Sequence, residues 1–236
     1  MGDACPGYAE LHSRSNYSFL TAASHPEELV QRAAALGYSA LALTDECSVA
    51  GAVRAHVAAK AAGLHLIVGS ELRTETGQCL VLLAADRRGY GNLTHLITGA
   101  RRRAGKGAYR VEGGELYGGL DGCLLLWVAQ GQEDPEIGRR LAAAFPRRAW
   151  VCAELHRAGG DGGRLAALRR LARVCGLPLM AAGGVRMHLP ARKPLLDTLT
   201  AIRLGIPVAA AGEALDQNRE ACLRPRRELA RFFPAE

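Results

Sequence analysis

The chain has 236 residues, of which 49% are apolar and 22% charged, so it can bury one large α/β domain or two small ones. Thirty basic residues against 23 acidic ones give a formal net charge of +7. This excess is compatible with a polyanionic partner such as nucleic acid, but GC-rich coding and ordinary surface charge explain it slightly better.

The cysteines and the apolar stretches indicate the compartment. The seven cysteines are scattered, odd in number and free of Cys-x-x-Cys spacing, which argues against a disulfide framework or a zinc knuckle. The first residues lack the pattern of a signal peptide, and no apolar stretch approaches the roughly 20 residues that span a bilayer. We therefore expect a reduced, cytoplasmic protein with no membrane partner.

Short apolar runs of strand length recur along the chain, and most are separated by helical stretches. Strands are predicted over 8–12, 39–44, 64–69, 79–84, 122–129, 149–155 and 178–182. Helices are predicted over 26–36, 49–62, 134–145, 164–175 and 194–204. In the first helix, Ser24 is the expected cap and Glu27 the expected partner in a capping box. Segment 100–119, which is glycine-rich and basic, is predicted to be a surface excursion.

The alternation of strands and helices predicts how the strands are arranged. Repeated β-α order implies parallel strands with right-handed crossovers, except that a short polar link at 73–78 predicts a hairpin-like connection. Seven strands suit a closed or nearly closed barrel better than an open Rossmann sheet. Neither a GxGxxG after the first strand nor a P-loop is present.

Polar side chains stand at the C-terminal ends of several predicted strands, which share one rim if the strands are parallel. They are His12, Arg14, Asp45, Glu46, Glu71, Glu154, His156 and His188. Converging carboxylates and imidazoles, with one coordination position open for water, are what a metal hydrolase needs. A loop-anchoring hydrogen bond is the commoner role for any one of them alone. Only their joint placement favours a metal site.

The segment after the first strand offers half of such a site. A His-x-His pair at positions 12 and 14 would place two imidazoles on one face of the strand. This chain has His12 and then Arg14, and a permanent cation cannot ligate a metal ion.

Several strings of residues resemble a known family. His12 with Ser15-Asn-Tyr-Ser18, the string at 40–45 and Gly69-Ser-Glu71 together resemble the PHP (polymerase and histidinol phosphatase) domain. The strings at 22–30, 44–51, 80–84, 89–93 and 192–203 resemble, in that order, the error-prone branch of the bacterial DNA polymerase III α-subunit family. The similarity runs from about residue 8 to the end of the chain.

The resemblance implies a single-domain, distorted (β/α)7, TIM-like barrel at the start of a much longer translesion polymerase. We expect a tail at 1–7, the barrel over 8–205, and an extension over 206–236 leading toward the polymerase core. The implied partners are that core, DNA, a sliding clamp and accessory mutagenesis proteins, with roles in DNA replication and repair. This segment offers no closely spaced Asp pair for nucleotidyl transfer, so that chemistry is expected outside it.

The resemblance also implies a ligand set. His12, Asp45 and Glu71 occupy ligand positions, and Glu46 is a carboxylate where the family has a histidine. Four other ligand positions carry Arg14, Cys79, Gly184 and Arg186. We expect the first four residues to be remnants of a metal site, with the two arginines paired to Glu46, Glu71 or Glu154 instead of a metal. A single weakly held Mn, Zn or Mg ion near His188 is compatible with this set, and no other cofactor is expected.

Two functions follow from this set. The first is a structural, PHP-like module of an error-prone DNA polymerase, with arginine clusters that lend positive charge near DNA. These clusters comprise 101–103 with Lys106, and Arg224, Arg226, Arg227 and Arg231, although a solvated surface is their commoner role. The second is a metal-dependent phosphoesterase or 3'-5' exonuclease that uses His12, Asp45, Glu46 and Glu71. The loss of ligands favours the first.

Overall fold

The computed structural model describes residues 7–233 of the chain. The predicted tail at 1–7 therefore lies outside the described residues except for its last member, and so does Cys5. The six described cysteines are free thiols.

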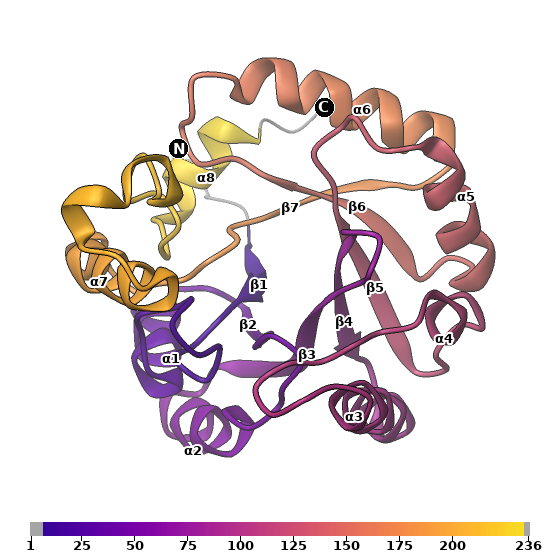
Figure 1. Cartoon of the computed structure of the whole chain (residues 1–236), viewed down its shortest axis with the longest axis horizontal. Coiled ribbons are helices and arrows are strands. Elements are labelled where there is room, and N and C mark those ends of the chain that lie inside the picture. Colours follow the sequence, from indigo (N-terminus) through magenta and orange to yellow (C-terminus); the bar gives the residue numbers. More distant parts are fainter. Residues whose placement is uncertain (1–6, 234–236) are drawn as a thin grey trace, which may run out of the picture.

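Seven strands form one sheet whose spatial order follows the sequence, and the sheet curls into a nearly closed barrel (Figure 1). They are β1 (Ala9–Ser13), β2 (Ala40–Leu43), β3 (His65–Arg73), β4 (Cys79–Ala84), β5 (Cys123–Val128), β6 (Ala149–Glu154) and β7 (Leu179–Ala182). Backbone hydrogen bonds from Arg14 N to Val185 O (2.8 Å) and from Val185 N to His12 O (2.9 Å) join the two ends of the sheet. The predicted strands and the α/β barrel are confirmed.

Strand β4 departs from the parallel order. It pairs antiparallel with β3 through a tight turn, which confirms the hairpin-like connection, and it is also antiparallel to β5. The expectation that the other strands are parallel is therefore wrong for the β4–β5 pair. A short link cannot carry the chain back for a parallel strand, so β4 must reverse. As a result, Cys79 at the start of β4 lies beside Arg73 at the end of β3.

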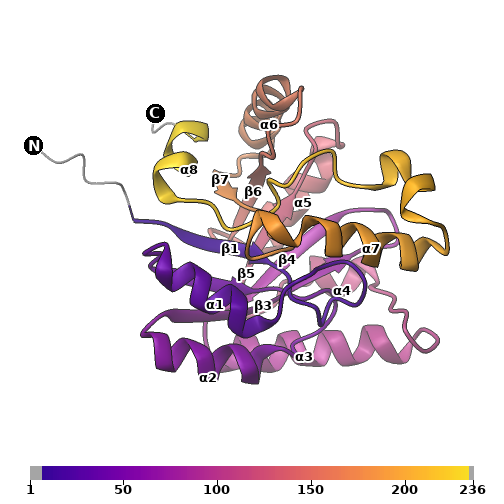
Figure 2. The same cartoon turned by 90° about the vertical axis from the view of Figure 1, so that its left-hand side faces the viewer.

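Helices surround the barrel (Figure 1 and Figure 2). They are α1 (Pro26–Ala35), α2 (Ala52–Ala62), α3 (Arg87–Arg102), α4 (Gly113–Tyr117), α5 (Pro135–Ala144), α6 (Asp161–Cys175), α7 (Lys193–Leu204) and α8 (Arg226–Phe232). All the predicted helices are present, with ends shifted by a few residues. Among the described residues, no helix is long and apolar enough to cross a membrane.

The start of α1 differs from the prediction. The carboxylate of Glu28, not Glu27, accepts a hydrogen bond of 2.8 Å from the backbone N–H of His25, the residue before the helix. The hydroxyl of Ser24 instead accepts a hydrogen bond of 2.7 Å from the backbone N–H of His188. Ser24 therefore ties the start of α1 to the segment after β7.

Helix α3 was not predicted. Its buried residues Leu93, Leu96 and Ala100 recur at helical spacing, and Asp86 caps it by accepting a hydrogen bond of 2.7 Å from Gly89 N. Its glycines hide the pattern, because glycine disfavours helices. Gly89 is required by packing, since a Cβ there would lie 1.9 Å from the carbonyl oxygen of Gly122.

The segment after α3 is more than a surface excursion. Because β4 is antiparallel, its C-terminal end lies at the rim formed by the N-terminal ends of the parallel strands. Helix α3 begins at that rim and runs toward the other one, where segment 103–112 follows it. Val111 and Leu116 are buried in the core, with exposed fractions of 1% each. The prediction for 100–119 is therefore wrong in its second half.

Apolar side chains pack on both sides of the sheet. Side chains such as Val81, Leu83 and Leu126 fill the barrel, whereas Leu80 and Leu82 on the other face of β4 pack under the helices. This alternation follows from the two-residue period of a strand. It sends Glu71 and Glu154 to the same side as the residues that fill the barrel, because their strand partners Val81 and Ala182 belong to that group.

Candidate functional site

The rim at the C-terminal ends of the parallel strands holds the candidate site. His12, Asp45, Glu71 and Glu154 are all buried there, with exposed fractions of 8% or less. Their ionisable groups must therefore find partners within the protein. We use the name inner cluster for His12, Arg14, Glu71, Arg73 and Glu154.

A β-bulge places His12 at the centre of the inner cluster. Leu11 and His12 together face a single residue of β2, between the pairs Glu10–Leu41 and Ser13–Leu43. A bulge of this kind re-aims a side chain, and here it turns the imidazole into the barrel. The ring Nδ1 lies 2.5 Å from Glu154 Oε1, and Nε2 lies 2.9 Å from Glu71 Oε2.

These two contacts determine the charge of His12. Burial alone lowers its pKa, but the carboxylates of Glu154 and Glu71 raise the pKa of His12 to about 9. At neutral pH the ring is therefore an imidazolium that donates a hydrogen bond from each nitrogen. An imidazolium has no lone pair for a metal ion.

Glu71 is the carboxylate on which the cations of the inner cluster converge. Arg14 Nε lies 3.5 Å from Glu71 Oε2, and an Arg73 guanidinium nitrogen lies 2.9 Å from Glu71 Oε1. Burial opposes ionisation, but Arg14, His12 and Arg73 hold the pKa of Glu71 well below its usual range. The pKa of Glu154 is also lowered, because His12 outweighs the effect of burial. Both carboxylates are ionised and neutralised by side chains of the chain itself.

Asp45 is hydrogen-bonded to the segment that follows β1. Its two oxygens accept hydrogen bonds from the Ser15 N–H (2.8 Å), the Ser15 hydroxyl (2.8 Å) and the Ser18 hydroxyl (2.7 Å). Burial raises the pKa of Asp45, and these bonds lower it only in part. Asp45 therefore fixes the conformation of segment 14–21, which follows β1.

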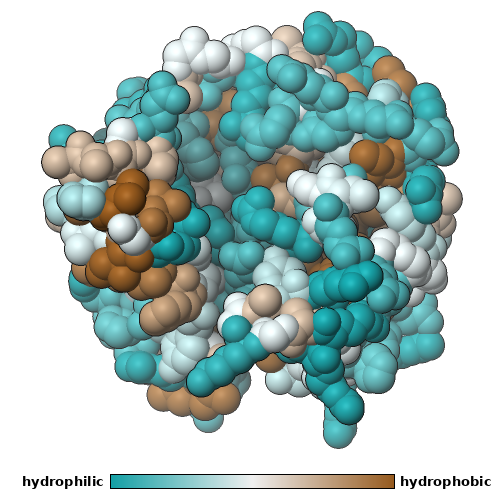
Figure 3. All heavy atoms as spheres, in the orientation of Figure 1, coloured by the Kyte–Doolittle hydropathy of each residue, from teal (hydrophilic) through white to brown (hydrophobic). Residues whose placement is uncertain are grey.

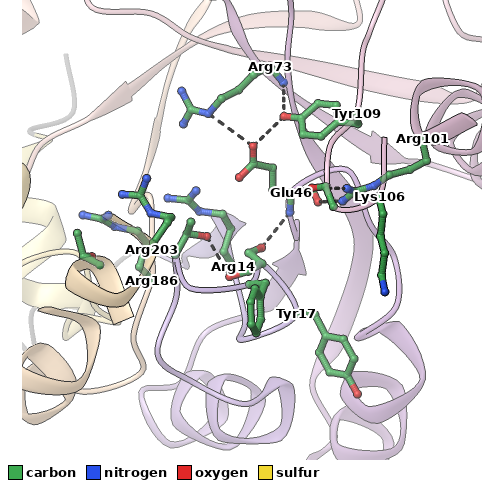
Figure 4. A pocket seen from close by; sticks show the side chains of 14 residues that line it. Arg14, Tyr17, Glu46, Arg73, Arg101, Lys106, Tyr109, Arg186 and Arg203 are labelled. Atoms are coloured by element: carbon green, nitrogen blue, oxygen red, sulfur yellow. Dashed lines mark hydrogen bonds and ion pairs between the residues drawn. The ribbon is translucent and has the colours of Figure 1, made fainter. Parts of the chain in front are cut away.

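The side chain of Glu46 reaches the inner cluster only at Arg73. Its Oε1 accepts a hydrogen bond of 2.8 Å from the Tyr109 hydroxyl and lies 4.0 Å from Arg73 Nε (Figure 4). The Tyr109 hydroxyl in turn accepts a hydrogen bond of 3.0 Å from Arg73 N. Of the four candidate ligands, the structure thus joins His12 to Glu71 and gives Asp45 and Glu46 separate partners.

The predicted pairing of Arg186 is wrong. Its guanidinium pairs with Asp216, on the segment after α7, and not with Glu46, Glu71 or Glu154. Position 184, another of the expected ligand positions, has no room for a side chain. Gly184 has φ +55°, and a Cβ there would lie 2.4 Å from Glu154 Oε2, so Glu154 occupies the space that a side chain would need.

The two other histidines of the rim anchor loops. His156 Nε2 lies 2.7 Å from the carbonyl oxygen of Gly183, and His188 Nδ1 lies 2.8 Å from the Ser24 hydroxyl. Within residues 7–233, no three His, Cys, Asp or Glu side chains are grouped so that they could hold a metal ion.

A basic pocket of about 800 Å3 opens above the inner cluster (Figure 4). Glu46 is its one acidic lining residue among those described, and six basic side chains line it. They are Arg14, Arg73, Arg101, Lys106, Arg186 and Arg203. Arg203 and Tyr109 are functional candidates that the sequence reasoning missed. Arg203 lies in the last turn of α7 and Tyr109 in the segment after α3, and their position at the pocket cannot be seen without the fold.

Three arginines of the clusters predicted from the sequence have partners within the chain. Arg101 donates to the carbonyl oxygens of Cys47 and Glu46, each at 3.2 Å, and Arg103 pairs with Glu115 at 2.7 Å. Arg224 is only 3% exposed, and its guanidinium lies 5.3 Å from the ring centroid of Phe232. Each of these three side chains is thus held in place by contacts within the chain, and Arg101 also lines the basic pocket.

The chain is similar to known proteins over nearly its whole length. Residues 10–125 match the model of the PHP domain. The chain is 54% identical over 236 residues to an error-prone DNA polymerase of Dechloromonas aromatica, covering 98% of this chain and 23% of that protein. It is 56% identical over 228 residues to an error-prone DNA polymerase of Methylococcus capsulatus, covering 96% and 22%. The chain thus spans less than a quarter of the length of these curated relatives.

Solved structures show the same fold at low identity. A protein of Bifidobacterium adolescentis, assigned as a metal-dependent phosphoesterase, aligns with a TM-score of 0.56 at 13% identity, over 75% of this chain and 87% of that one. An amidohydrolase of Chromobacterium violaceum aligns with a TM-score of 0.51 at 16% identity, over 96% and 97%.

Proposed function

Because the chain carries a PHP domain and is homologous over nearly its whole length to segments of error-prone DNA polymerases, we propose that it is the PHP-like domain of such a polymerase and has a structural role. The observation that carries this proposal is the inner cluster. Both ring nitrogens of His12 lie against carboxylates, and Arg14 and Arg73 lie against Glu71. Arginine and imidazolium cations thus neutralise the carboxylates.

The residues present do not fit a metal centre. Both ring nitrogens of His12 lie against carboxylates, and Arg14 adds a fixed positive charge beside Glu71, where a metal cation would be repelled. Asp45 is committed to Ser15 and Ser18. We therefore propose that His12, Asp45, Glu46 and Glu71 are remnants of a ligand set, and we derive no catalytic step through Mn, Zn or Mg.

The proposed role is packing against the polymerase core of the same parent chain. Leu195, Ile202, Leu204, Ile206 and Val208 are exposed on α7 and just after it. Apolar side chains gather there at the left of Figure 3, while much of the rest of this face is hydrophilic. An exposed apolar patch of this kind marks a protein interface. We propose that the barrel at 8–205 and the extension at 206–236 dock on the core through this side.

The activity of the whole parent protein is part of the proposal. We extend the proposal to a cytoplasmic DNA-directed DNA polymerase, a nucleotidyltransferase that acts in translesion synthesis, DNA replication and DNA repair. The homology to error-prone DNA polymerases is what supports the polymerase activity. Its partners would be DNA, a sliding clamp and accessory mutagenesis proteins. The alternative for this domain is a metal-dependent phosphoesterase or 3'-5' exonuclease with a residual ion.

Metal content and phosphoester hydrolysis test the proposal. The purified chain is expected to contain no stoichiometric Mn, Zn, Fe or Mg by elemental analysis, and to leave a generic phosphoester and a single-stranded oligonucleotide uncleaved. His12→Ala is expected to change stability only, with His56→Ala on the exposed face of α2 as the matched control. Anomalous scattering from two or more ions at the rim, or hydrolysis that His12→Ala abolishes, would overturn the structural role.

A further inference from the structure

The sheet is not closed along the whole length of its first and last strands. The two ends of the sheet pair only at Ser13 and Val185, and Val185 lies just beyond the end of β7. Two residues earlier, the carboxylate of Glu10 accepts hydrogen bonds of 2.8 and 3.0 Å from Gly183 N, so a side chain replaces the backbone ladder there. Residues 179–181 pair with β6 on one side and with no described strand on the other. The outer edge of β7 therefore presents unpaired backbone groups.

A hollow of about 430 Å3 opens along this edge, and we call it the β7 groove. It lies on the outside of the barrel, where α6 and α8 flank β7 (Figure 2). The residues that line it include Leu165, Arg173, Leu179, Met180, Ala181 and Phe233. It shares no lining residue with the basic pocket at the rim.

The β7 groove gives access to the strand edge. Leu179, Met180 and Ala181 all line it, although successive side chains of a strand point to opposite faces of a sheet. Leu179 packs with the core under the helices, whereas Met180 packs with the residues that fill the barrel. Three consecutive residues line one hollow together where the edge of the strand, and not a single face, borders it.

The walls of the β7 groove are apolar. Leu165 on α6 and Phe233 at the end of α8 are half-buried there. A second hollow of about 110 Å3 shares Ala181 and Phe233 with the β7 groove, so the two adjoin along the strand. Adjoining apolar hollows beside an open strand edge suit a segment that carries apolar side chains at intervals.

The charged residues of the β7 groove are basic. Arg169 and Arg173, one turn apart on α6, line it, and among the described residues no acidic side chain does. Arg173 is exposed and forms no ion pair with any residue between 7 and 233. An uncompensated cation beside an apolar wall favours a partner that combines apolar side chains with carboxylates.

From these observations we propose that the β7 groove binds an extended, acidic segment of a partner protein. The segment adds as a strand to the outer edge of β7, one of its apolar side chains enters the hollow beside Phe233, and a carboxylate lies against Arg173. An extended segment fits better than a helix, because a helix bonds its own backbone and leaves the edge of β7 unpaired. The proposed structural role does not require this site, so the two can fail separately.

Fluorescence anisotropy of a labelled heptapeptide of alternating glutamate and valine, titrated with the purified 236-residue chain, tests the site. We expect saturable binding that weakens as the salt concentration rises. The same peptide with lysine in place of glutamate is expected to bind at least about tenfold more weakly. Methylation of the three central amide nitrogens removes the donors that strand addition needs, and it is expected to weaken binding by at least about tenfold.

Substitutions in α6 locate the binding site. Arg173→Ala is expected to weaken binding by about threefold, and Leu165→Trp, which fills the hollow, by at least about tenfold. Arg170→Ala and Val174→Trp make the same changes at exposed positions of α6 outside the β7 groove, and both are expected to leave binding unchanged. Circular dichroism verifies the folding of each variant.

Hydrogen exchange identifies the occupied edge. Saturating peptide is expected to slow exchange of the backbone amides in segment 179–182 and to leave segment 65–68 of β3 unchanged. Absent binding, equal binding of the lysine peptide, equal losses in the groove and control variants, or protection confined to other segments would overturn the proposal. If sedimentation shows that the chain pairs with itself and Leu165→Trp abolishes the pairing, the occupant is a second copy and the proposal of an acidic partner is wrong.

Discussion

The inner cluster and the basic pocket lie next to each other on the same rim, but they differ in how far their charges are paired. In the inner cluster every carboxylate faces a cation, and Glu71 alone contacts His12, Arg14 and Arg73. In the basic pocket Lys106 and Arg203 have no acidic partner among residues 7–233. Burial explains the difference, because an unpaired charge costs far more inside a protein than in contact with water.

This contrast separates stability from binding. Matched buried charges hold the rim together, and removing one member exposes the others to the full desolvation cost. Unmatched charges at the surface contribute little to folding but remain free to meet an anion. Substitutions in the two regions should therefore have different effects, and four measurements test this, from the largest expected effect to the smallest.

Glu71→Gln is expected to destabilise the chain by about 3–5 kcal/mol, because it removes the carboxylate that buried His12 and Arg14 both face and leaves Arg14 without an acidic partner among residues 7–233. The free energy of unfolding in urea measures this. Glu75→Gln is the matched control, since Glu75 pairs with Arg110 at an exposed position, and it should cost less than about 1 kcal/mol. Equal losses of unfolding free energy in the two variants would contradict the expectation that the buried ion pairs stabilise the chain more than the exposed pair does.

Ser18→Ala is expected to cost about 2 kcal/mol, because the Ser18 hydroxyl donates to Asp45 and accepts from the Glu46 N–H at 2.9 Å. Both partners are left without this contact. Ser39→Ala removes one exposed hydrogen bond to Tyr8 and should cost about 0.5 kcal/mol. If Ser18→Ala proves as mild as Ser39→Ala in urea unfolding, Asp45 does not organise segment 14–21.

The imidazolium of His12 predicts a pH dependence. The folded-state pKa of about 9 lies above the ordinary value of 6.5, so its contribution is present in full below pH 6.5 and is lost as pH rises through 9. Between pH 6.5 and 8 the free energy of unfolding should fall by about 1.5 kcal/mol. The same measurement on His12→Gln is the control and should show a flat profile in this window. Parallel profiles would mean that His12 is neutral when folded.

Arg186→Ala is expected to cost no more than about 1 kcal/mol, because the ion pair with Asp216 lies at the pocket wall, where its side chains are 24% and 29% exposed. Arg88→Ala, which removes a more exposed pair with Asp121, should cost still less. A loss as large as that of Glu71→Gln would show that the pocket wall is as tightly coupled to folding as the inner cluster.

Some of the site was predictable and some was not. The strand-end positions of His12, Asp45 and Glu71 follow from apolar runs that stop just before them, so their gathering at one rim could be expected from the sequence. The bulge at Leu11 and His12 could not, because it shows only in the pairing of β1 with β2. Arg203 was missed because α7 carries it to the pocket from outside the strands.

The sequence by itself determined the seven strands, most of the helices and the barrel, because these depend on apolar period and on signals a few residues apart. The tertiary structure decided which charges meet. His12 lies 59 positions from Glu71 and 142 from Glu154, and no local pattern encodes such distances. The antiparallel pairing of β4 with β5, the space that Glu154 takes at Gly184 and the pairing of Arg186 with Asp216 were likewise decided by packing. Long-range contacts depend on how the elements fit together in space, which a one-dimensional pattern does not record.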